Sequence, residues 1–174
     1  LIGERSPRWN PDARACFLGV GMEHTQKDFL RAVQEGVAMN LNEVLRVFRA
    51  AGEKMDEIIV VGGGVNSRTW QETESLTKRR YSGLDGQENS EMIVHSHQQI
   101  LADVYQKKIR VPKLLDEATS MGAAITGGVG VGLFSDFSAT DRFVSIARDC
   151  LPNAANAPKY ERMQAAFNEA YDSL

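Results

Sequence analysis

The sequence lacks the features that would support a disulfide framework, a metal cluster or a membrane span. Two cysteines, Cys16 and Cys150, lie far apart among 174 residues, which excludes a small disulfide-stapled fold and favours a reducing, cytoplasmic environment. No apolar run approaches the ~20 residues that cross a bilayer, and the first residues do not resemble a signal peptide. The net charge of -3 provides no basic surface for nucleic acid. We therefore expect neither a membrane nor a nucleic-acid partner.

The composition is that of one ordinary globular domain. Hydrophobic residues make up 43% and charged residues 25% of the chain, which is enough to build a core. The stretch from Gly3 to Pro11 is rich in turn residues and follows no secondary-structure element. Because domains seldom start in this way, we expect the chain to be one part of a longer protein.

A long amphipathic helix is predicted from Thr25 to about Gly52. Thr25 is followed three residues later by Asp28, a variant of the capping box with Asp in place of Glu or Gln. Apolar residues then recur at steps of three and four, as on one helix face: Leu30, Val33, Val37, Leu41, Val44 and Phe48.

A glycine turn follows a predicted strand in the middle of the chain. Ile58–Val61 is a β-branched run without alternation, typical of a strand buried on both faces. Gly62, Gly63 and Gly64 follow directly, and Ser67 is placed to cap a new helix. Strand, glycine turn and helix start can hold a phosphate group. A tight turn without a ligand remains the alternative; the spacing matches neither the Rossmann nor the Walker A motif.

Further elements alternate in the same way. The sequence predicts a helix over 99–107, a strand over Ile109–Val111 and a helix over 117–133. Such alternation is typical of an α/β layer with parallel pairing. The small residues of 117–133 favour close packing of that helix on the sheet, and its glycine-rich tail is expected to unwind. Tyr160 to Tyr171 marks a terminal helix. Residues 72–98 interrupt the order and are expected to form an exposed insertion.

Several conspicuous residues have a plain structural interpretation. His95 and His97 lack a third metal ligand nearby, so we expect surface histidines and no metal site. Glu35 is expected to be a structural acid within the long helix. Arg5, Arg8 and Arg14 could be cations of a cleft or solvated loop residues, and both alternatives stay open. Trp9 and Trp70 are expected to be packing anchors, with Trp70 bordering an adenine site as a second interpretation.

The motifs, in their order, resemble the FGGY family of carbohydrate kinases over nearly the whole chain except residues 72–98. The matching strings are Gly3-Glu-Arg-Ser-Pro-Arg-Trp-Asn-Pro-Asp-Ala-Arg, Phe17-Leu-Gly-Val-Gly-Met with His24 and Phe29-Leu-Arg-Ala-Val-Gln-Glu-Gly-Val, Val61-Gly-Gly-Gly-Val-Asn-Ser-Arg-Thr-Trp, and Asp116-Glu-Ala-Thr-Ser-Met-Gly-Ala-Ala. The last of these, with Gln99-Ile-Leu-Ala-Asp-Val, follows the order of the xylulokinase branch.

The resemblance implies the C-terminal half of an actin-like ATPase (ribonuclease H-like) fold, truncated at its N-terminus and spanning residues 1–174. It also implies ATP and Mg²⁺ as cofactors. Carried over position by position, Gly63 and Gly64 would contact ATP most closely, followed by Gly62 and Ser67. Arg68 would lie beside the adenine, where some relatives have Asn, and could stack on it. The implied reaction is phosphorylation of a sugar, D-xylulose first, with glycerol, gluconate or ribulose as alternatives.

Two departures from the family pattern limit what this chain can do. The phosphate-binding Asp-x-Gly-Thr string is absent from the sequence, and the sugar-binding and catalytic residues are expected upstream, so no catalytic residue is assigned here. The 72–98 insertion falls within the helix expected after the glycine turn. Either that helix stops early and resumes near His97, or the insertion bulges out beside the nucleotide. We expect the isolated chain to be inactive. A non-catalytic module remains the alternative, forming a homodimer or binding a separate N-terminal half.

Overall fold

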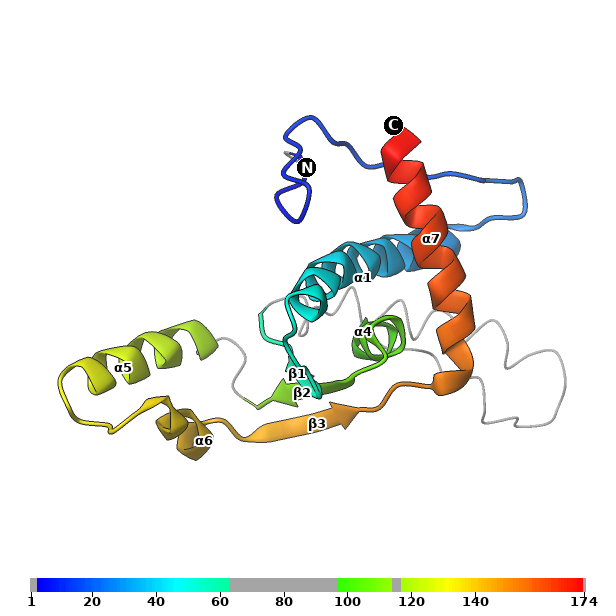
Figure 1. Ribbon diagram of the computed structural model, residues 1–174. Helices are drawn as coiled ribbons and strands as arrows, with labels where there is room; N and C mark the ends of the chain where they lie inside the picture. The colour runs from blue at the N-terminus through cyan, green and yellow to red at the C-terminus, as the bar shows by residue number, and fades with distance from the viewer. Residues whose placement is uncertain (1–2, 63–96, 114–116, 174) are drawn as a thin grey trace, which may run out of the picture.

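The computed structural model describes residues 3–62, 97–113 and 117–173, and it has the predicted α/β class (Figure 1). The elements, in chain order, are α1 (Gln26–Ala50), β1 (Glu57–Ile59), α4 (His97–Tyr105), β2 (Lys108–Pro112), α5 (Ala118–Gly130), η1 (Phe137–Ala139), α6 (Thr140–Phe143), β3 (Ile146–Cys150), η2 (Ala154–Asn156) and α7 (Ala157–Ser173). The helices and strands predicted within the described ranges are therefore present, each within a few residues of its predicted position.

The described strands form one sheet in the order β1-β2-β3. β1 and β2 are parallel, as predicted, with Ile58 opposite Ile109. β3 runs antiparallel to β2, with Cys150 opposite Ile109. The alternation up to residue 133 gave no indication of β3, whose sequence Ile-Ala-Arg-Asp-Cys contains two charged residues and no alternation of apolar and polar side chains.

Helix α4 is the centre of the molecule. α1, α7 and the inner face of the sheet pack around it (Figure 1), and nearly every residue from Gln98 to Tyr105 is buried. Ile100 of α4 and Ile109 of β2 are fully buried in the core, with Ala38 of α1 and Tyr160 of α7 beside them. A helix that is apolar on most sides is stable only when it is enclosed in this way.

Helix α1 begins at the predicted cap. The Thr25 backbone N–H donates to Asp28 Oδ2 at 2.7 Å, so Asp performs the role of the usual Glu. The face that α1 buries was not predicted: Gln34, Glu35, Ala38, Met39 and Asn42 point inward, and the apolar stripe remains largely uncovered.

Polar partners explain why α1 buries polar groups. Arg31 Nε and the Tyr160 hydroxyl both donate to Glu35 Oε1, at 2.8 and 3.0 Å. Asn42 Nδ2 donates to Gln164 Oε1 at 3.1 Å. These bonds satisfy buried groups that would otherwise be costly. The prediction that Glu35 is a structural acid is confirmed.

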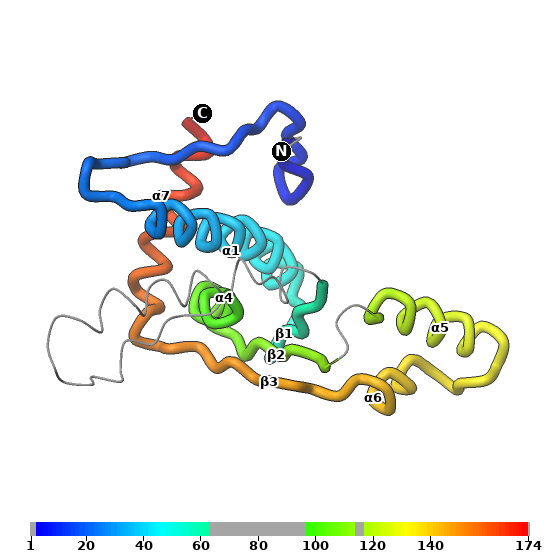
Figure 2. Tube along the Cα trace, turned by 180° about the vertical axis from the view of Figure 1, so that it is seen from behind, coloured from blue at the N-terminus to red at the C-terminus, as the bar shows by residue number. Residues whose placement is uncertain are grey.

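Four predictions about packing are wrong. β1 is not buried on both faces: Ile59 and Val61 are 49% and 50% exposed, because only part of the outer face is covered. α5 does not lie flat on the sheet but extends past its edge with α6, on the side away from α7 (Figures 1 and 2). Trp9 is 74% exposed and anchors nothing. Gln98, placed in the exposed insertion, is 2% exposed within α4; residues 72–96 of that insertion lie outside the described residues.

In the part of the chain that the structure describes, no helix combines the length and the apolar character needed to cross a membrane.

Candidate functional site

The carboxyl end of β1 leads into the predicted glycine turn. Gly62 has φ 99°, a backbone conformation that side-chain-bearing residues rarely adopt. A Cβ atom built there would meet nothing within 4 Å. The backbone, and not a lack of space, therefore requires glycine at this position. Ligands of parallel α/β sheets bind outside the carboxyl ends of strands, which is where this turn lies.

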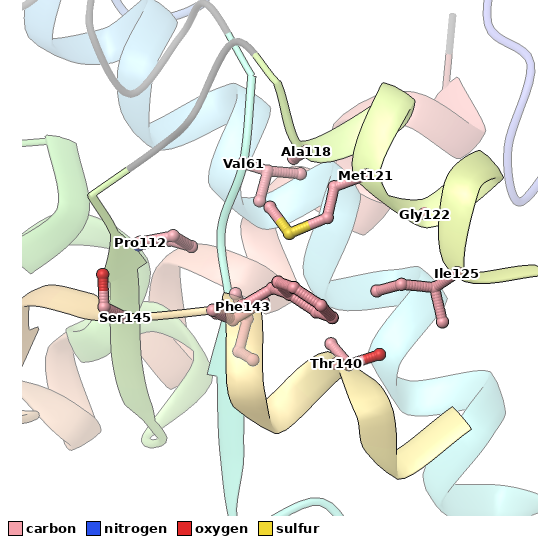
Figure 3. A pocket seen from close by; sticks show the side chains of 11 residues that line it. Val61, Pro112, Ala118, Met121, Gly122, Ile125, Thr140, Phe143 and Ser145 are labelled. Atoms are coloured by element: carbon pink, nitrogen blue, oxygen red, sulfur yellow. The ribbon is translucent and has the colours of Figure 1, made fainter. Parts of the chain in front are cut away.

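An apolar hollow of about 180 Å³ lies beside the turn, on the outer face of the sheet. Figure 3 shows Met121 of α5 and Phe143 of α6 pointing toward one another across it, with Val61 beside Met121. Its lining comes from β1, the end of β2, α5 and the α6 region: Ile59, Val61, Pro112, Ala118, Met121, Gly122, Ile125, Thr140, Phe143, Val144 and Ser145. A whole drug-sized ligand needs about 300 Å³ or more, so the hollow suits one flat apolar group.

Aromatic packing behind the hollow positions Phe143. The Phe143 ring meets Phe134 edge-on, with ring centroids 5.9 Å apart. Phe134 in turn lies against Gly128 of α5, where an added Cβ would come within 2.5 Å of the ring. Gly128 therefore allows α5 and the α6 segment to close around the hollow.

The charged end of the outer face is separate from the hollow. Lys108 and Arg110, at the start of β2, form ion pairs with Asp149 of β3 at 2.8 and 3.3 Å. Arg110 also pairs with Glu57 of β1 at 2.9 Å. The hydrogen bond from Lys108 lowers the pKa of Asp149. Both cations are thus engaged within the sheet and are not free to bind phosphate.

Among residues 3–62, 97–113 and 117–173, no group of three His, Cys, Asp or Glu side chains is arranged to hold a metal ion. His97 begins α4 and is half-buried, and burial lowers the pKa of its imidazole; His95 lies outside the described residues.

Most residues that the sequence predicts to contact ATP lie outside the part of the chain that the structure describes. Gly63, Gly64, Ser67 and Arg68 lie outside the described residues, as does Trp70, so their expected contacts with ATP stay predictions.

The three arginines of the N-terminal segment also differ from one another. Arg8 stacks on the Tyr171 ring at 4.0 Å and donates to Asn168 Oδ1 at 3.0 Å, so it anchors the N-terminal segment to α7. Arg14 donates to the Pro11 and Ala13 carbonyl groups, and Arg5 is exposed. Arg8 is therefore neither a cation of a cleft nor a solvated loop residue, the two alternatives that the sequence left open.

The hollow itself was missed by sequence reasoning. Met121, Ile125 and Phe143 are ordinary apolar residues far from Val61 in the chain, and no local pattern marks them as one site. A weak signal existed in the glycines of α5, which indicated a close approach of some other element.

The C-terminal domain of the FGGY family of carbohydrate kinases matches residues 1–131, and this chain belongs to that family. It is 30% identical to xylulose kinase of Staphylococcus epidermidis over 172 residues, which cover 98% of this chain and 29% of that protein. It is 28% identical to gluconokinase of Bacillus subtilis over 171 residues, or 96% of this chain and 27% of that protein. The chain thus spans less than a third of the length of these relatives.

Solved structures agree on the fold. The chain superposes on ligand-bound xylulose kinase from Lactobacillus acidophilus with a TM-score of 0.74 and 22% identity, covering 99% of this chain and 30% of that one. Plasmodium falciparum glycerol kinase with ADP gives a TM-score of 0.67 and 21% identity, covering 99% and 29%. The predicted fold, the C-terminal half of an actin-like ATPase, is confirmed.

Proposed function

We propose that this chain is the nucleotide-binding half of a cytoplasmic kinase that transfers the γ-phosphoryl group of ATP to a sugar hydroxyl, with D-xylulose as the sugar. The observation that carries the proposal is the Gly62 turn at the carboxyl end of β1, beside an apolar hollow, in a chain of the FGGY family. The xylulose kinase named above favours D-xylulose. Gluconate is the alternative, because the gluconokinase is nearly as similar.

Within this proposal the nucleotide lies across the end of β1. The adenine occupies the hollow between Val61, Met121 and Phe143, which fits one flat apolar group. The backbone N–H groups of the turn from Gly62 to Gly64, with Ser67, face the phosphates, and Arg68 lies beside the adenine. Mg²⁺ arrives bound to the ATP phosphates, since it is usually held by substrate phosphates and few protein ligands.

The rest of the reaction belongs to parts that this chain does not contain. In the transfer, a bond forms between the sugar oxygen and the γ-phosphorus while the bond to the ADP oxygen breaks, and a base must accept the hydroxyl proton. No residue of the described site is such a base. Residues 1–174 therefore form one nucleotide-binding domain, with the expected insertion after Trp70, and the isolated chain turns over no sugar.

Calorimetry of ATP and ADP binding to the purified chain tests the proposal. We expect dissociation constants from micromolar to low millimolar. Gly64→Asp, which puts a negative charge next to the phosphates, should abolish binding, and Met121→Glu in the hollow should weaken it about tenfold or more. Met22→Glu is the matched control, because Met22 is fully exposed and remote from the hollow. A folded chain that binds neither nucleotide would overturn the proposal and favour a non-catalytic module.

A further inference from the structure

The wall of the apolar hollow carries few groups that could read a nucleobase by hydrogen bonding. Among the described residues, 11 line the hollow, and all but two of these have an apolar side chain or, at Gly122, none. The two exceptions, Thr140 and Ser145, carry hydroxyl groups, whose oxygen atoms are drawn in Figure 3. The described wall therefore offers a base two polar side chains, both of the same chemical kind.

The two hydroxyl groups cannot tell adenine from guanine. A hydroxyl group both donates and accepts hydrogen bonds, and it rotates to suit its partner. Adenine carries an amino group at the position where guanine carries a carbonyl oxygen. Thr140 and Ser145 can pair with either group, so they favour neither base.

Backbone groups beside the two hydroxyls are already paired within the chain. The Val144 N–H donates to the Thr140 carbonyl oxygen at 2.9 Å, and the Ser145 carbonyl oxygen accepts the Lys113 N–H at 2.9 Å. A backbone N–H only donates and a C=O only accepts, so such groups are the ones that could distinguish an amino group from a carbonyl oxygen. With these two engaged, the apolar side chains remain as the main contacts of a base.

Met121 and Phe143 supply those contacts. They point toward one another across the hollow (Figure 3), so a flat ring between them meets a polarizable thioether on one side and an aromatic ring on the other. Stacking on an aromatic ring tolerates any base, because every base has a π-face. A purine nevertheless covers more of the apolar wall than the single ring of a pyrimidine does, and its gain from burial is larger.

We propose that the hollow selects a purine by its size and shape and does not select adenine by hydrogen bonding, so that this chain binds GTP as well as ATP. The inference rests on the proposed function, since it takes the base of the nucleotide to lie in the hollow. A site built to hydrogen-bond one substrate rejects an analogue without the matching group by about 10⁴-fold or more, whereas an apolar pocket discriminates by about 100-fold at most.

Calorimetric titration of the purified full chain with four probes tests the inference: ATP, GTP, UTP and inorganic triphosphate. We expect the dissociation constants of ATP and GTP to agree within about tenfold. UTP should bind about tenfold more weakly than ATP, because it buries less apolar area. Inorganic triphosphate, which has no base, should bind at least about tenfold more weakly than ATP.

Two substitutions identify the hollow as the site of the base. Phe143→Ala should weaken ATP and GTP by the same factor, about tenfold, and leave inorganic triphosphate unchanged. Phe137→Ala is the matched control, because Phe137 is 61% exposed and does not line the hollow. Thr140→Val, which removes one hydroxyl group at nearly constant volume, should change the ratio of the ATP and GTP affinities by less than about threefold.

ATP that binds more than about 100-fold tighter than GTP would overturn the inference and leave the proposed function standing. Inorganic triphosphate that binds as tightly as ATP would overturn it as well, because equal affinities for ATP and GTP would then come from the phosphates alone. A large change of the ATP to GTP ratio in Thr140→Val would show that the hydroxyl group reads the base. A folded chain that binds none of the probes would overturn the proposed function, and the inference with it.

Discussion

Tyr160 lies at the contact between α7 and α1, where its hydroxyl group is shared by two side chains. It donates to Glu35 Oε1 at 3.0 Å and accepts from Arg31 Nη2 at 2.9 Å. Burial, together with the negative charge of Glu35, raises the pKa of Tyr160 to about 12. The hydroxyl group therefore stays protonated and donating at all physiological pH values.

We expect Tyr160→Phe to lower the free energy of unfolding by about 1–3 kcal/mol, because it leaves a buried carboxylate without one donor. Urea unfolding of the purified chain measures this change.

Tyr171→Phe is the matched control. The Tyr171 hydroxyl is also buried but has no hydrogen-bond partner among the described residues, so its removal should change stability by less than about 0.5 kcal/mol. Equal losses in the two variants would show that the shared hydroxyl of Tyr160 contributes nothing specific.

The three strands are linked on their outer face by the ion pairs of Lys108 and Arg110. Asp149 accepts hydrogen bonds from both cations. The hydrogen bond from Lys108 is the main cause that lowers the pKa of the Asp149 carboxyl group. A carboxylate whose pKa is lowered by folding contributes stability above its unfolded pKa, and the contribution is lost as the pH falls through the folded value.

We therefore expect the stability of the chain to fall below about pH 4, the pKa range of an unperturbed Asp. Thermal unfolding between pH 3 and 7 should show a smaller decline for Asp149→Asn than for the unaltered chain. The same substitution at Asp172, which is exposed on α7 and forms no ion pair with any other residue that the structure describes, is the control. Identical pH profiles for the chain and for Asp149→Asn would contradict the expectation.

Helix α5 offers a pair of adjacent glycines with opposite environments. A Cβ at Gly127 would meet nothing within 4 Å, whereas one at Gly128 would meet the Phe134 ring at 2.5 Å. Gly127→Ala should raise the melting temperature, since alanine gains up to about 1 kcal/mol over glycine inside a helix.

Gly128→Ala should lower the melting temperature, because overpacking costs about 1–3 kcal/mol. It displaces Phe134 and with it Phe143 at the hollow, so nucleotide affinity should also fall. Stabilisation by both substitutions would show that Phe134 is not held in place.

At the scale of the whole molecule, Asp103 joins the central helix to the segment between β3 and α7. It is fully buried and accepts from the Asn153 backbone N–H at 2.8 Å and from Asn156 Nδ2 at 2.7 Å. We expect Asp103→Ala to cost at least about 2 kcal/mol, because the partly buried donors of Asn153 and Asn156 lose their acceptor. Hydrogen exchange should accelerate in α7 more than in β2.

Asp172→Ala removes an exposed carboxylate from α7 itself and should have an effect of less than about 0.5 kcal/mol. If Asp103→Ala left exchange in α7 unchanged, the attachment of that helix would depend on apolar packing alone.

The sequence by itself determined the local elements of this protein. Side-chain and backbone preferences that act over a few residues account for three of them: the cap at Thr25, the strand over Ile109–Val111 and the positive φ at Gly62. The order of the motifs was also enough to assign the family, and with it the fold.

Tertiary structure alone decided what each element faces. Periodicity located the apolar stripe of α1 correctly, but it could not show that the opposite face is buried, because bonds from Tyr160 and Gln164 satisfy the polar groups there. The hollow between Val61, Met121 and Phe143 likewise depends on contacts between segments distant in sequence. Local preferences carry no information about such partners, since burial is a property of the assembled chain and not of the residue.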